Sequence, residues 1–275
     1  MKLDLFRRMS QWELKRENRY AIEDRYKNFT GHIDFLECHI PYTNFRNVEA
    51  MMDRAEKIKG KKMLVIAADF LNLDLFGPFL STTDNVSMPE DEIKMGLELL
   101  KEAAKVYDYE VFLEGNHDAR ISKVVKREVK DVRVQDQINK LVGGYDKIFK
   151  EAKKLDIVHS YIFQIGNVLI AHMENNSSVP GKTGRDLVQY LVPRIKKHWD
   201  VIYQAHTHSQ SKLPIDRKLA IEIGCAADSL DYWIRGKMSG KGKFGTMGYG
   251  VCDMVRGYAD MNDCNFVISQ WQGYI

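Results

Sequence analysis

The sequence predicts an α/β fold in which two mixed β-sheets pack together and helices flank them. From about residue 32 to residue 113, apolar segments of strand length alternate with segments of helical periodicity. Beyond residue 160 the apolar segments follow one another more densely, and we expect them to be partly antiparallel. With 275 residues, of which 44% are hydrophobic and 29% charged, the chain is long enough for a sizeable core.

The first 30 residues are predicted to form a basic helical N-terminal extension, with a polar helix over 5–28. This segment holds eight Lys/Arg and five Asp/Glu, so its formal charge equals the +3 of the whole chain. Such a segment can contact phosphate backbones, and a solvated helix face is the alternative. Residues 31–275 are predicted to form a single domain.

Within that domain, each predicted element rests on its own pattern. Strands are expected over 32–36, 63–67, 110–113, 161–165, 167–171, 201–204, 219–223 and 265–270. Helices are expected over 46–59, 91–106 and 184–197, with a further helical region at about 121–155. Residues 236–250 are rich in Gly and Lys and are predicted to be a loop.

The cysteine pattern favours reduced thiols and a cytoplasmic location. The four cysteines, Cys38, Cys225, Cys252 and Cys264, form no C-x-x-C pair. The N-terminus is charged and has no apolar h-region, so no secretory signal is expected. The longest apolar stretches, such as Met63–Ala68, are too short to span a bilayer.

Histidines cluster at the ends of the predicted strands. Five of the eight follow apolar runs, at positions His39, His117, His172, His206 and His208, and Asp69 ends the run MLVIAAD. Polar groups gathered at strand ends are the usual construction of an α/β active site. Imidazole nitrogens and carboxylate oxygens without thiolates suit Mn, Fe, Zn or Ni, and argue against a structural zinc site.

Two local patterns refine this interpretation. In EGNHDAR, Asn116 and His117 are adjacent, so one can bind a metal while the other faces a substrate. In AHTH, His206 and His208 are two residues apart and point the same way on an extended segment. Glu37 and His39 have the same relation, which directs Cys38 between them into the core.

The order of these blocks resembles the calcineurin-like metallophosphoesterases. Their pattern is D-x-H, GD-x-x-D/N, GNH-D/E, H and GH-x-H, and this chain has ECH, ADFLN, GNHD, His172 and AHTH between residues 37 and 208. The resemblance implies a metallophosphoesterase-like αββα sandwich. It also implies two divalent metal ions, with Mn the first choice and Fe, Zn or Ni the alternatives.

The resemblance assigns roles to individual residues. The first metal would be held by Glu37, His39, Asp69 and His208, and the second by Asp69, Asn116, His172 and His206. His117 would be the general acid, and Asp118 would orient or tune it. Asn72, Arg120 and Lys182 would have substrate-side or supporting roles. Lys182 belongs to a loop predicted over 172–185.

Three positions depart from the family pattern. Glu37 stands where the family has Asp, and its extra methylene moves the carboxylate by about one bond length. Either Glu37 reaches the metal, or a water takes its place. Ala68 and Ala205 stand where Gly is usual, and each adds a Cβ near the metals.

The resemblance therefore implies a phosphoesterase in which a water activated by two metals attacks phosphorus. A phosphodiesterase or nuclease acting on nucleic acid or nucleotides is the first hypothesis, because of the basic segments. A phosphomonoesterase acting on a phosphoprotein or metabolite is the second. A weakly active metal-binding module is the third, and Glu37 is its only support.

Overall fold

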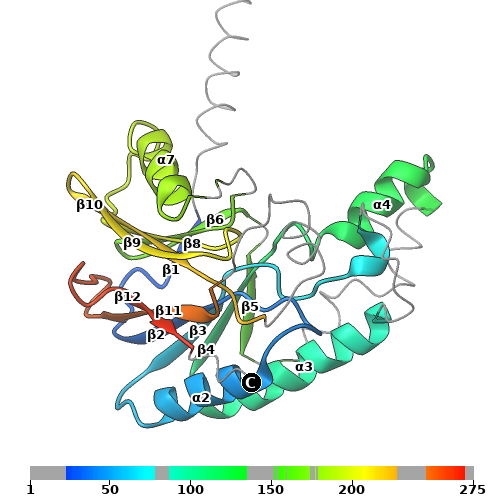
Figure 1. Ribbon diagram of the computed structural model, residues 1–275, viewed down its shortest axis with the longest axis horizontal. Coiled ribbons are helices and arrows are strands. Elements are labelled where there is room, and N and C mark those ends of the chain that lie inside the picture. The colour runs from blue at the N-terminus through cyan, green and yellow to red at the C-terminus, as the bar shows by residue number, and fades with distance from the viewer. Residues whose placement is uncertain are drawn as a thin grey trace, which may run out of the picture.

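The computed structural model describes residues 23–77, 87–134, 152, 154–158, 160–173, 177, 179–227 and 246–269. Within these ranges the chain forms two six-stranded sheets, with strand orders β12-β11-β2-β3-β4-β5 and β1-β6-β7-β8-β10-β9 (Figure 1). We call them the first and the second sheet. Both are mixed, because parallel and antiparallel pairs occur in each.

The first sheet consists of β2 (Gly31–Leu36), β3 (Lys62–Ile66), β4 (Tyr109–Leu113), β5 (Leu155–Val158), β11 (Gly248–Met254) and β12 (Asn265–Ile268). The second consists of β1 (Glu23–Arg25), β6 (Ile162–Ile165), β7 (Val168–Ala171), β8 (Val201–Gln204), β9 (Gln210–Ile215) and β10 (Lys218–Ile223). The helices are α2 (Phe45–Glu56), η1 (Asp74–Phe76), α3 (Pro89–Val106), α4 (Arg120–Glu128) and α7 (Lys182–Leu191). No helix of the described residues is long and apolar enough to cross a membrane.

The main core lies between the two sheets. It takes alternate residues from each strand, because successive side chains of a strand point to opposite faces. In β3, Met63 and Val65 enter this core, whereas Leu64 and Ile66 face the other way. Phe35 of the first sheet stacks on Tyr203 of the second, with ring centroids 4.0 Å apart. The two sheets therefore pack directly face to face.

Helices cover the outer faces of both sheets. The apolar face of α2, formed by Val48, Met51 and Ala55, packs in one cluster with α3 and the outward residues of β3. On the opposite side, α7 packs Leu187 and Val188 against the second sheet (Figure 1). The result is the four-layered α/β sandwich that the sequence predicted.

Several predicted elements differ from the observed ones. Residues Glu23–Arg25, expected at the end of a helix, form β1 and pair in parallel with β6. The helical region expected at 121–155 contains α4 but ends in the strand β5, whose pairing with β4 the local pattern does not reveal. Residues 1–22 and most of 135–153 lie outside the described residues, as do 78–86 and 228–245.

The predicted loop at 236–250 ends inside a strand. Gly248 and Gly250 belong to β11, which pairs antiparallel with β2 and β12. A Cβ added to Gly250 would lie 2.8 Å from Ile223 Cγ2 and 2.9 Å from the Tyr203 ring. Glycine is therefore needed here for the close approach of the two sheets, which a reading of Gly as a loop signal does not detect.

We predict that Gly250→Ala destabilises the protein by about 1–3 kcal/mol, the usual cost of overpacking a core. The added methyl must displace Tyr203 or Ile223 at the interface between the sheets. Urea denaturation measures the loss, with the exposed helical substitution Glu98→Ala as the control. A free energy of unfolding equal to that of the wild type would contradict the packing described.

Candidate metal centre

The predicted ligands meet at one edge of the sandwich, where strands of both sheets end. β2, β3 and β4 run parallel, as do β7 and β8, so within each sheet their carboxyl ends lie at the same edge. The side chains that follow these ends are Glu37 and His39 after β2, Asp69 after β3, Asn116 and His117 after β4, His172 after β7, and His206 and His208 after β8. The fold thus brings residues that are 171 positions apart into contact.

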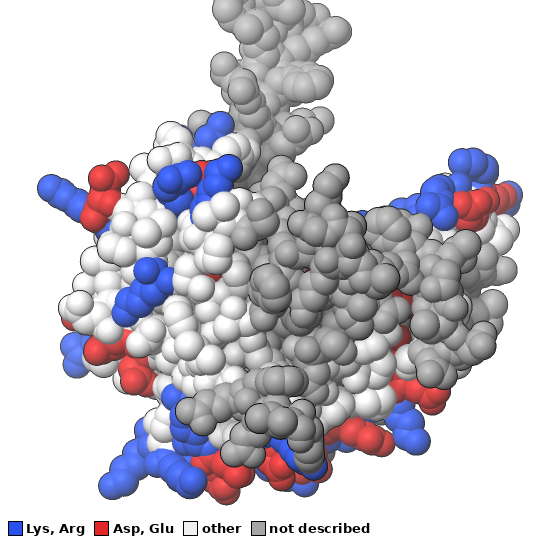
Figure 2. Space-filling model, viewed as in Figure 1, with Lys and Arg blue, Asp and Glu red and all other residues white. Residues whose placement is uncertain are grey.

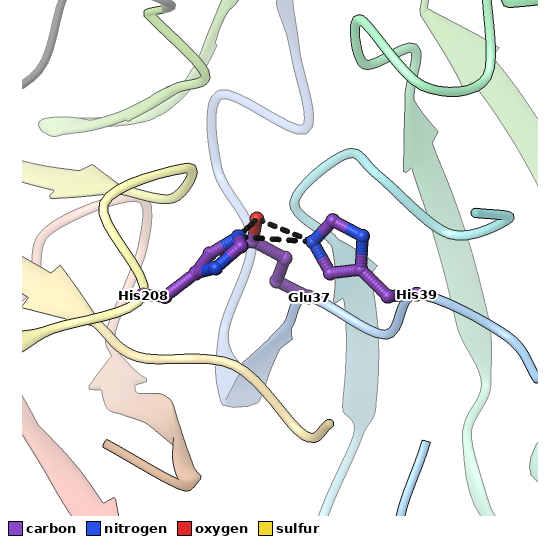
Figure 3. Close-up of side chains that lie close together, drawn as sticks. All are labelled: Glu37, His39 and His208. Carbon is purple, nitrogen blue, oxygen red and sulfur yellow. Dashed lines mark hydrogen bonds and ion pairs between the residues drawn. The ribbon is translucent and has the colours of Figure 1, made fainter. Parts of the chain in front are cut away.

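One group of side chains consists of Glu37, His39 and His208 (Figure 3). Glu37 Oε1 lies 3.2 Å from His39 Nε2 and 3.0 Å from His208 Nε2, and the two ring nitrogens are 3.0 Å apart. Glu37 Oε2 accepts a hydrogen bond of 2.8 Å from the backbone N–H of His206. The longer carboxylate therefore reaches the cluster and also binds the segment that carries His206 and His208.

A second group consists of Asp69, His172 and His206. Asp69 Oδ2 lies 3.0 Å from His172 Nε2 and 3.8 Å from His206 Nδ1. The same oxygen is 3.9 Å from His39 Nε2, which belongs to the first group. Asp69 therefore lies between the two groups.

The donor atoms of this edge fit divalent metal binding. Among the described residues, the buried side-chain atoms without a hydrogen-bond partner include Asp69 Oδ2, Asn116 Oδ1, both ring nitrogens of His172 and His206 Nδ1. Leaving such groups unpaired costs about 1–3 kcal/mol each. His172 Nε2 and Asp69 Oδ2 are close but not aligned as a hydrogen bond. Nitrogen and oxygen donors left unpaired in this way are the ligands that divalent transition metals prefer.

The backbone is strained at the same residues. His39, Asp69, His206 and His208 all have positive φ, between 44° and 68°. This region costs an L-residue roughly 1–2 kcal/mol, and such outliers cluster at functional sites. Of the two alanines that replace the family's glycines, Ala68 has φ 78° and Ala205 is not among the positive-φ residues. The departure at Ala68 therefore carries backbone strain.

Gly115, the first residue of GNHD, is required by the approach of Asp69. A Cβ at position 115 would lie 2.1 Å from Asp69 Oδ1 and 2.4 Å from the Asp69 backbone nitrogen. Two residues later, the backbone N–H of His117 donates to Asp69 Oδ1 at 3.0 Å. The loop after β4 thus fixes one oxygen of Asp69 and leaves the other facing the histidines.

Asn72 supports a ligand from behind. It is buried, and its Oδ1 lies 3.2 Å from His39 Nδ1. With the proton on Nδ1 directed at Asn72, the Nε2 lone pair of His39 faces the cluster, as a metal ligand requires. Asn72 was predicted to have a substrate-side or supporting role, and its side-chain oxygen is directed to the His39 ring.

Asp118 contacts backbone amides rather than the His117 ring. Its carboxylate accepts hydrogen bonds from the backbone of Gly115, Phe70 and Leu71 at 2.9–3.3 Å. It therefore ties the loop after β4 to the loop after β3. Burial, followed by the charge of Asp69, raises the pKa of Asp118 to about 7.

His117 is held by two other groups. Its Nδ1 lies 3.1 Å from the backbone oxygen of Asn72, and Arg120 Nη2 is 3.0 Å from its Nε2. Arg120 also donates to Asn72 O and to Asp74 Oδ1. Lys182 is exposed at the start of α7, and no hydrogen bond or ion pair of the described residues joins it to the cluster. Asn175, in the same predicted loop, lies outside the described residues.

Two supporting carboxylates were not predicted. Glu92 Oε2 accepts from the backbone of Asn72 and Leu73, and it comes from the first turn of α3. Glu222 binds the backbone N–H groups of Gly181 and Gly184 at the start of α7 and the hydroxyl of Ser209. A charged residue inside the apolar run LAIEI was the available signal for Glu222.

The charges of the cluster shift its pKa values. Burial opposes ionisation of Glu37, but the adjacent His208 and His39 rings outweigh it and lower the pKa of that carboxyl. Burial likewise opposes protonation of His172, but the Asp69 carboxylate outweighs it and raises the pKa of His172 to about 9. In the metal-free protein, His172 is therefore protonated at neutral pH.

We predict that Gly115→Ala disrupts the cluster, because its Cβ would displace the Asp69 carboxylate. Metal bound per chain, measured by inductively coupled plasma mass spectrometry, should fall by at least about half. Stability of the metal-free protein should fall by about 1–3 kcal/mol. Ala119→Gly, at a nearby loop position, is the control. It changes the conformational freedom of the same loop without placing an atom against Asp69. Full metal content in Gly115→Ala would contradict the proximity described.

We also predict that metal binding at pH 7 releases a proton from His172, because a metal ligand must be neutral imidazole. Affinity should then rise with pH up to about 9, where the metal-free ring loses its proton without help. Calorimetric titration with Mn²⁺ in two buffers of different ionisation enthalpy measures the number of protons released. In His172→Gln that number should fall by about one. A binding heat independent of the buffer at pH 7 would refute the prediction.

No family model and no curated protein matches this chain. Several solved structures match it in fold. A novel archaeal phosphodiesterase is 11% identical over 86% of this chain and 99% of its own, with a TM-score of 0.41. Vps29 with Zn²⁺ from Entamoeba histolytica is 9% identical over 86% and 98%, with a TM-score of 0.41. A hypothetical protein from Pyrococcus horikoshii is 8% identical over 88% of each chain, with a TM-score of 0.47.

The ordered motifs of this chain resemble the calcineurin-like metallophosphoesterases. At these identities and TM-scores the likeness to the solved structures is one of fold alone.

Proposed function

We propose that this protein is a metal-dependent phosphoesterase that hydrolyses phosphodiester bonds of nucleic acid or nucleotides. One observation carries the proposal. Side chains from five ordered motifs converge at one edge of the sandwich, and several of their buried donor atoms have no hydrogen-bond partner among the described residues. The first ion would be held by Glu37, His39, Asp69 and His208, and the second by Asp69, Asn116, His172 and His206. Asp69 would be shared between the two ions.

Two bound divalent cations would polarise the phosphoryl oxygens and lower the pKa of a water, so that hydroxide forms near neutral pH. Manganese is the ion proposed first, because the donors are nitrogen and oxygen without thiolate. The four cysteines are buried and form no disulfide. Reduced thiols support the proposal that the protein works in the cytoplasm.

The protein's own groups have distinct tasks in this proposal. Asp69 and Glu37 supply negative charge to the site, and Asn72 fixes the tautomer of His39. Asp118 and Glu92 accept hydrogen bonds from backbone N–H groups of the loop after β3, so that Asp69 keeps its position. These bonds preorganise the site, which lowers the cost of assembling it around a substrate.

His117 is proposed to protonate the leaving oxygen. Burial lowers the pKa of its ring well below the usual value. The Asp69 carboxylate raises this pKa, whereas the charges of His39 and Arg120 lower it further. An anionic phosphate beside the ring favours its protonated form and so opposes this shift. Arg120 contacts the same ring, so a phosphate oxygen near His117 would also meet its guanidinium.

The test is hydrolysis of bis(p-nitrophenyl) phosphate with Mn²⁺ and with EDTA, compared with hydrolysis of p-nitrophenyl phosphate. The proposal expects metal-dependent hydrolysis with the diester as the better substrate. Preference for the monoester would favour a phosphomonoesterase instead. No hydrolysis of either by metal-loaded protein would overturn the enzymatic proposal.

We predict that His117→Ala lowers kcat for the diester by about 10²–10⁴-fold, the range typical of general acid–base catalysis. Its metal content should stay near that of the wild type, because Asn116 and not His117 is the proposed ligand. Asp69→Ala is the contrasting variant and should lose metal and activity together. Loss of metal in His117→Ala would show that His117 is a ligand, which its membership in a cluster with His39 and Asp69 makes geometrically feasible.

A further inference from the structure

We propose that the basic face of α4 binds the sugar–phosphate backbone of a polynucleotide strand and leads it to the metal centre. We call the side chains Lys123, Lys126 and Arg127, together with Arg120 at the first position of the helix, the α4 basic face. The inference rests on the proposed function and names its substrate class as a polymer rather than a mononucleotide.

The helix starts at the site itself. Arg120 is the first residue of α4, and its Nη2 lies 3.0 Å from His117 Nε2. The backbone N–H of Arg120 donates to the His117 carbonyl at 2.9 Å, so no spacer separates the GNHD loop from the helix. From that point α4 runs outwards from the body of the sandwich (Figure 1). A strand lying on it would have one end near the phosphoester centre.

The charge of this segment exceeds that of the whole chain. Residues 120–133 contain six Lys/Arg and two Asp/Glu, a formal charge of +4, against +3 for all 275 residues. In Figure 2, which has the view of Figure 1, blue side chains gather at the position of α4, with a few red ones beside them. A local surplus of cations on a nearly neutral protein attracts polyanions to that location.

The cations lie on one side of the helix. At about 100° per residue, Arg120, Lys123 and Arg127 share a face, and Lys126 lies beside it. The other side carries Ile121 and Val125, which are buried against the body. Lys123, Lys126 and Arg127 are exposed. The basic side of α4 is therefore turned to solvent because its apolar side is fixed to the protein.

The ion pair that Arg127 makes within this helix is weak. Arg127 pairs with Glu128, and both side chains are more than 60% exposed. Such exposed pairs contribute about 0–1 kcal/mol and exchange readily with a phosphate. Cations in the last turn also complement the helix dipole, a role that concerns Lys126 and Arg127 but not Lys123, which lies in the first turn.

The dimensions also fit. The nine residues of α4 span about 13 Å at 1.5 Å per residue. At about 3.4 Å of rise per nucleotide of one strand, this length covers roughly four phosphates. Three exposed cations spaced along it can each meet a different phosphate. A mononucleotide would contact only the start of the helix.

The experiment compares two triple charge reversals in the full chain. The test variant is Lys123→Glu/Lys126→Glu/Arg127→Glu. The matched control is Lys57→Glu/Lys59→Glu/Lys101→Glu, which changes the net charge equally at exposed positions of α2's end and of α3. Binding of a fluorescein-labelled 20-mer oligodeoxynucleotide is measured by anisotropy in EDTA, over a range of salt concentrations.

We expect the test variant to raise Kd at least about tenfold and to reduce the slope of log K against log salt by about 2. The control should stay within about threefold of the wild type. Hydrolysis of bis(p-nitrophenyl) phosphate should be unchanged in both variants, because none of the six residues belongs to the site. Equal binding losses in the two variants, or none in the test variant, would overturn the inference.

Failure of the proposed function gives a different result. If no variant hydrolyses the small diester but oligonucleotide binding still depends on α4, the surface stands and the enzymatic proposal falls. If the small diester is cleaved but no oligonucleotide binds, the inference falls and the enzyme remains. Should the Glu triple not fold, by circular dichroism, the Lys123→Gln/Lys126→Gln/Arg127→Gln variant is used, with an expected rise in Kd of about fivefold.

Discussion

The position of the Asp69 carboxylate determines the arrangement of the whole site. It is completely buried, it follows β3 at positive φ, and one of its oxygens is fixed by the backbone of His117. The other oxygen faces histidines from both sheets at 3.0–3.9 Å. The ion-pair partners of Asp69 within the described part of the chain are histidines, and a buried carboxylate is costly unless positive charge compensates it. The histidines supply part of that charge, and divalent ions would supply the rest.

The surrounding structure serves to hold this carboxylate. Gly115 leaves room for it, and Asp118 and Glu92 bind the backbone of the next four residues, from Phe70 to Leu73. Glu37 makes the corresponding link on the other side, because its second oxygen binds the backbone of His206. The extra methylene of Glu37, compared with Asp, is used to span this distance. A shorter Asp would not reach both the two rings and the amide without movement of the loop.

Much of this arrangement could be predicted from the sequence, because the information was local. Strand ends were marked by apolar runs followed by His, Asp or Asn, and the ordered blocks placed Glu37, Asp69 and His208 in one site. The period-2 alternation in β3 and the helical spacing in α2 were equally plain. The order of strands within each sheet was not predicted. It depends on pairings such as that of β11 with β2, whose residues are more than 200 positions apart.

What the sequence did not reveal depends on close approach in space. Gly250 was predicted to lie in a loop because the segment is rich in glycine. In the structure it belongs to β11, and a glycine is needed there because β11 passes close to Tyr203. Glu92 was given no role and Asp118 was expected to orient or tune His117, whereas both accept hydrogen bonds from backbone amides of a neighbouring loop. Arg120 was given a substrate-side role, and in the structure it also bonds to Asp74 and lies beside the His117 ring. Partners of this kind become visible only when the strands are assembled.

The most direct measurement of the central claim is an anomalous difference map from crystals of the manganese-loaded protein. The account predicts two peaks about 3.5–4 Å apart on either side of Asp69 Oδ2, one beside Glu37, His39 and His208, the other beside Asn116, His172 and His206. A single peak, or peaks away from Asp69, would contradict it.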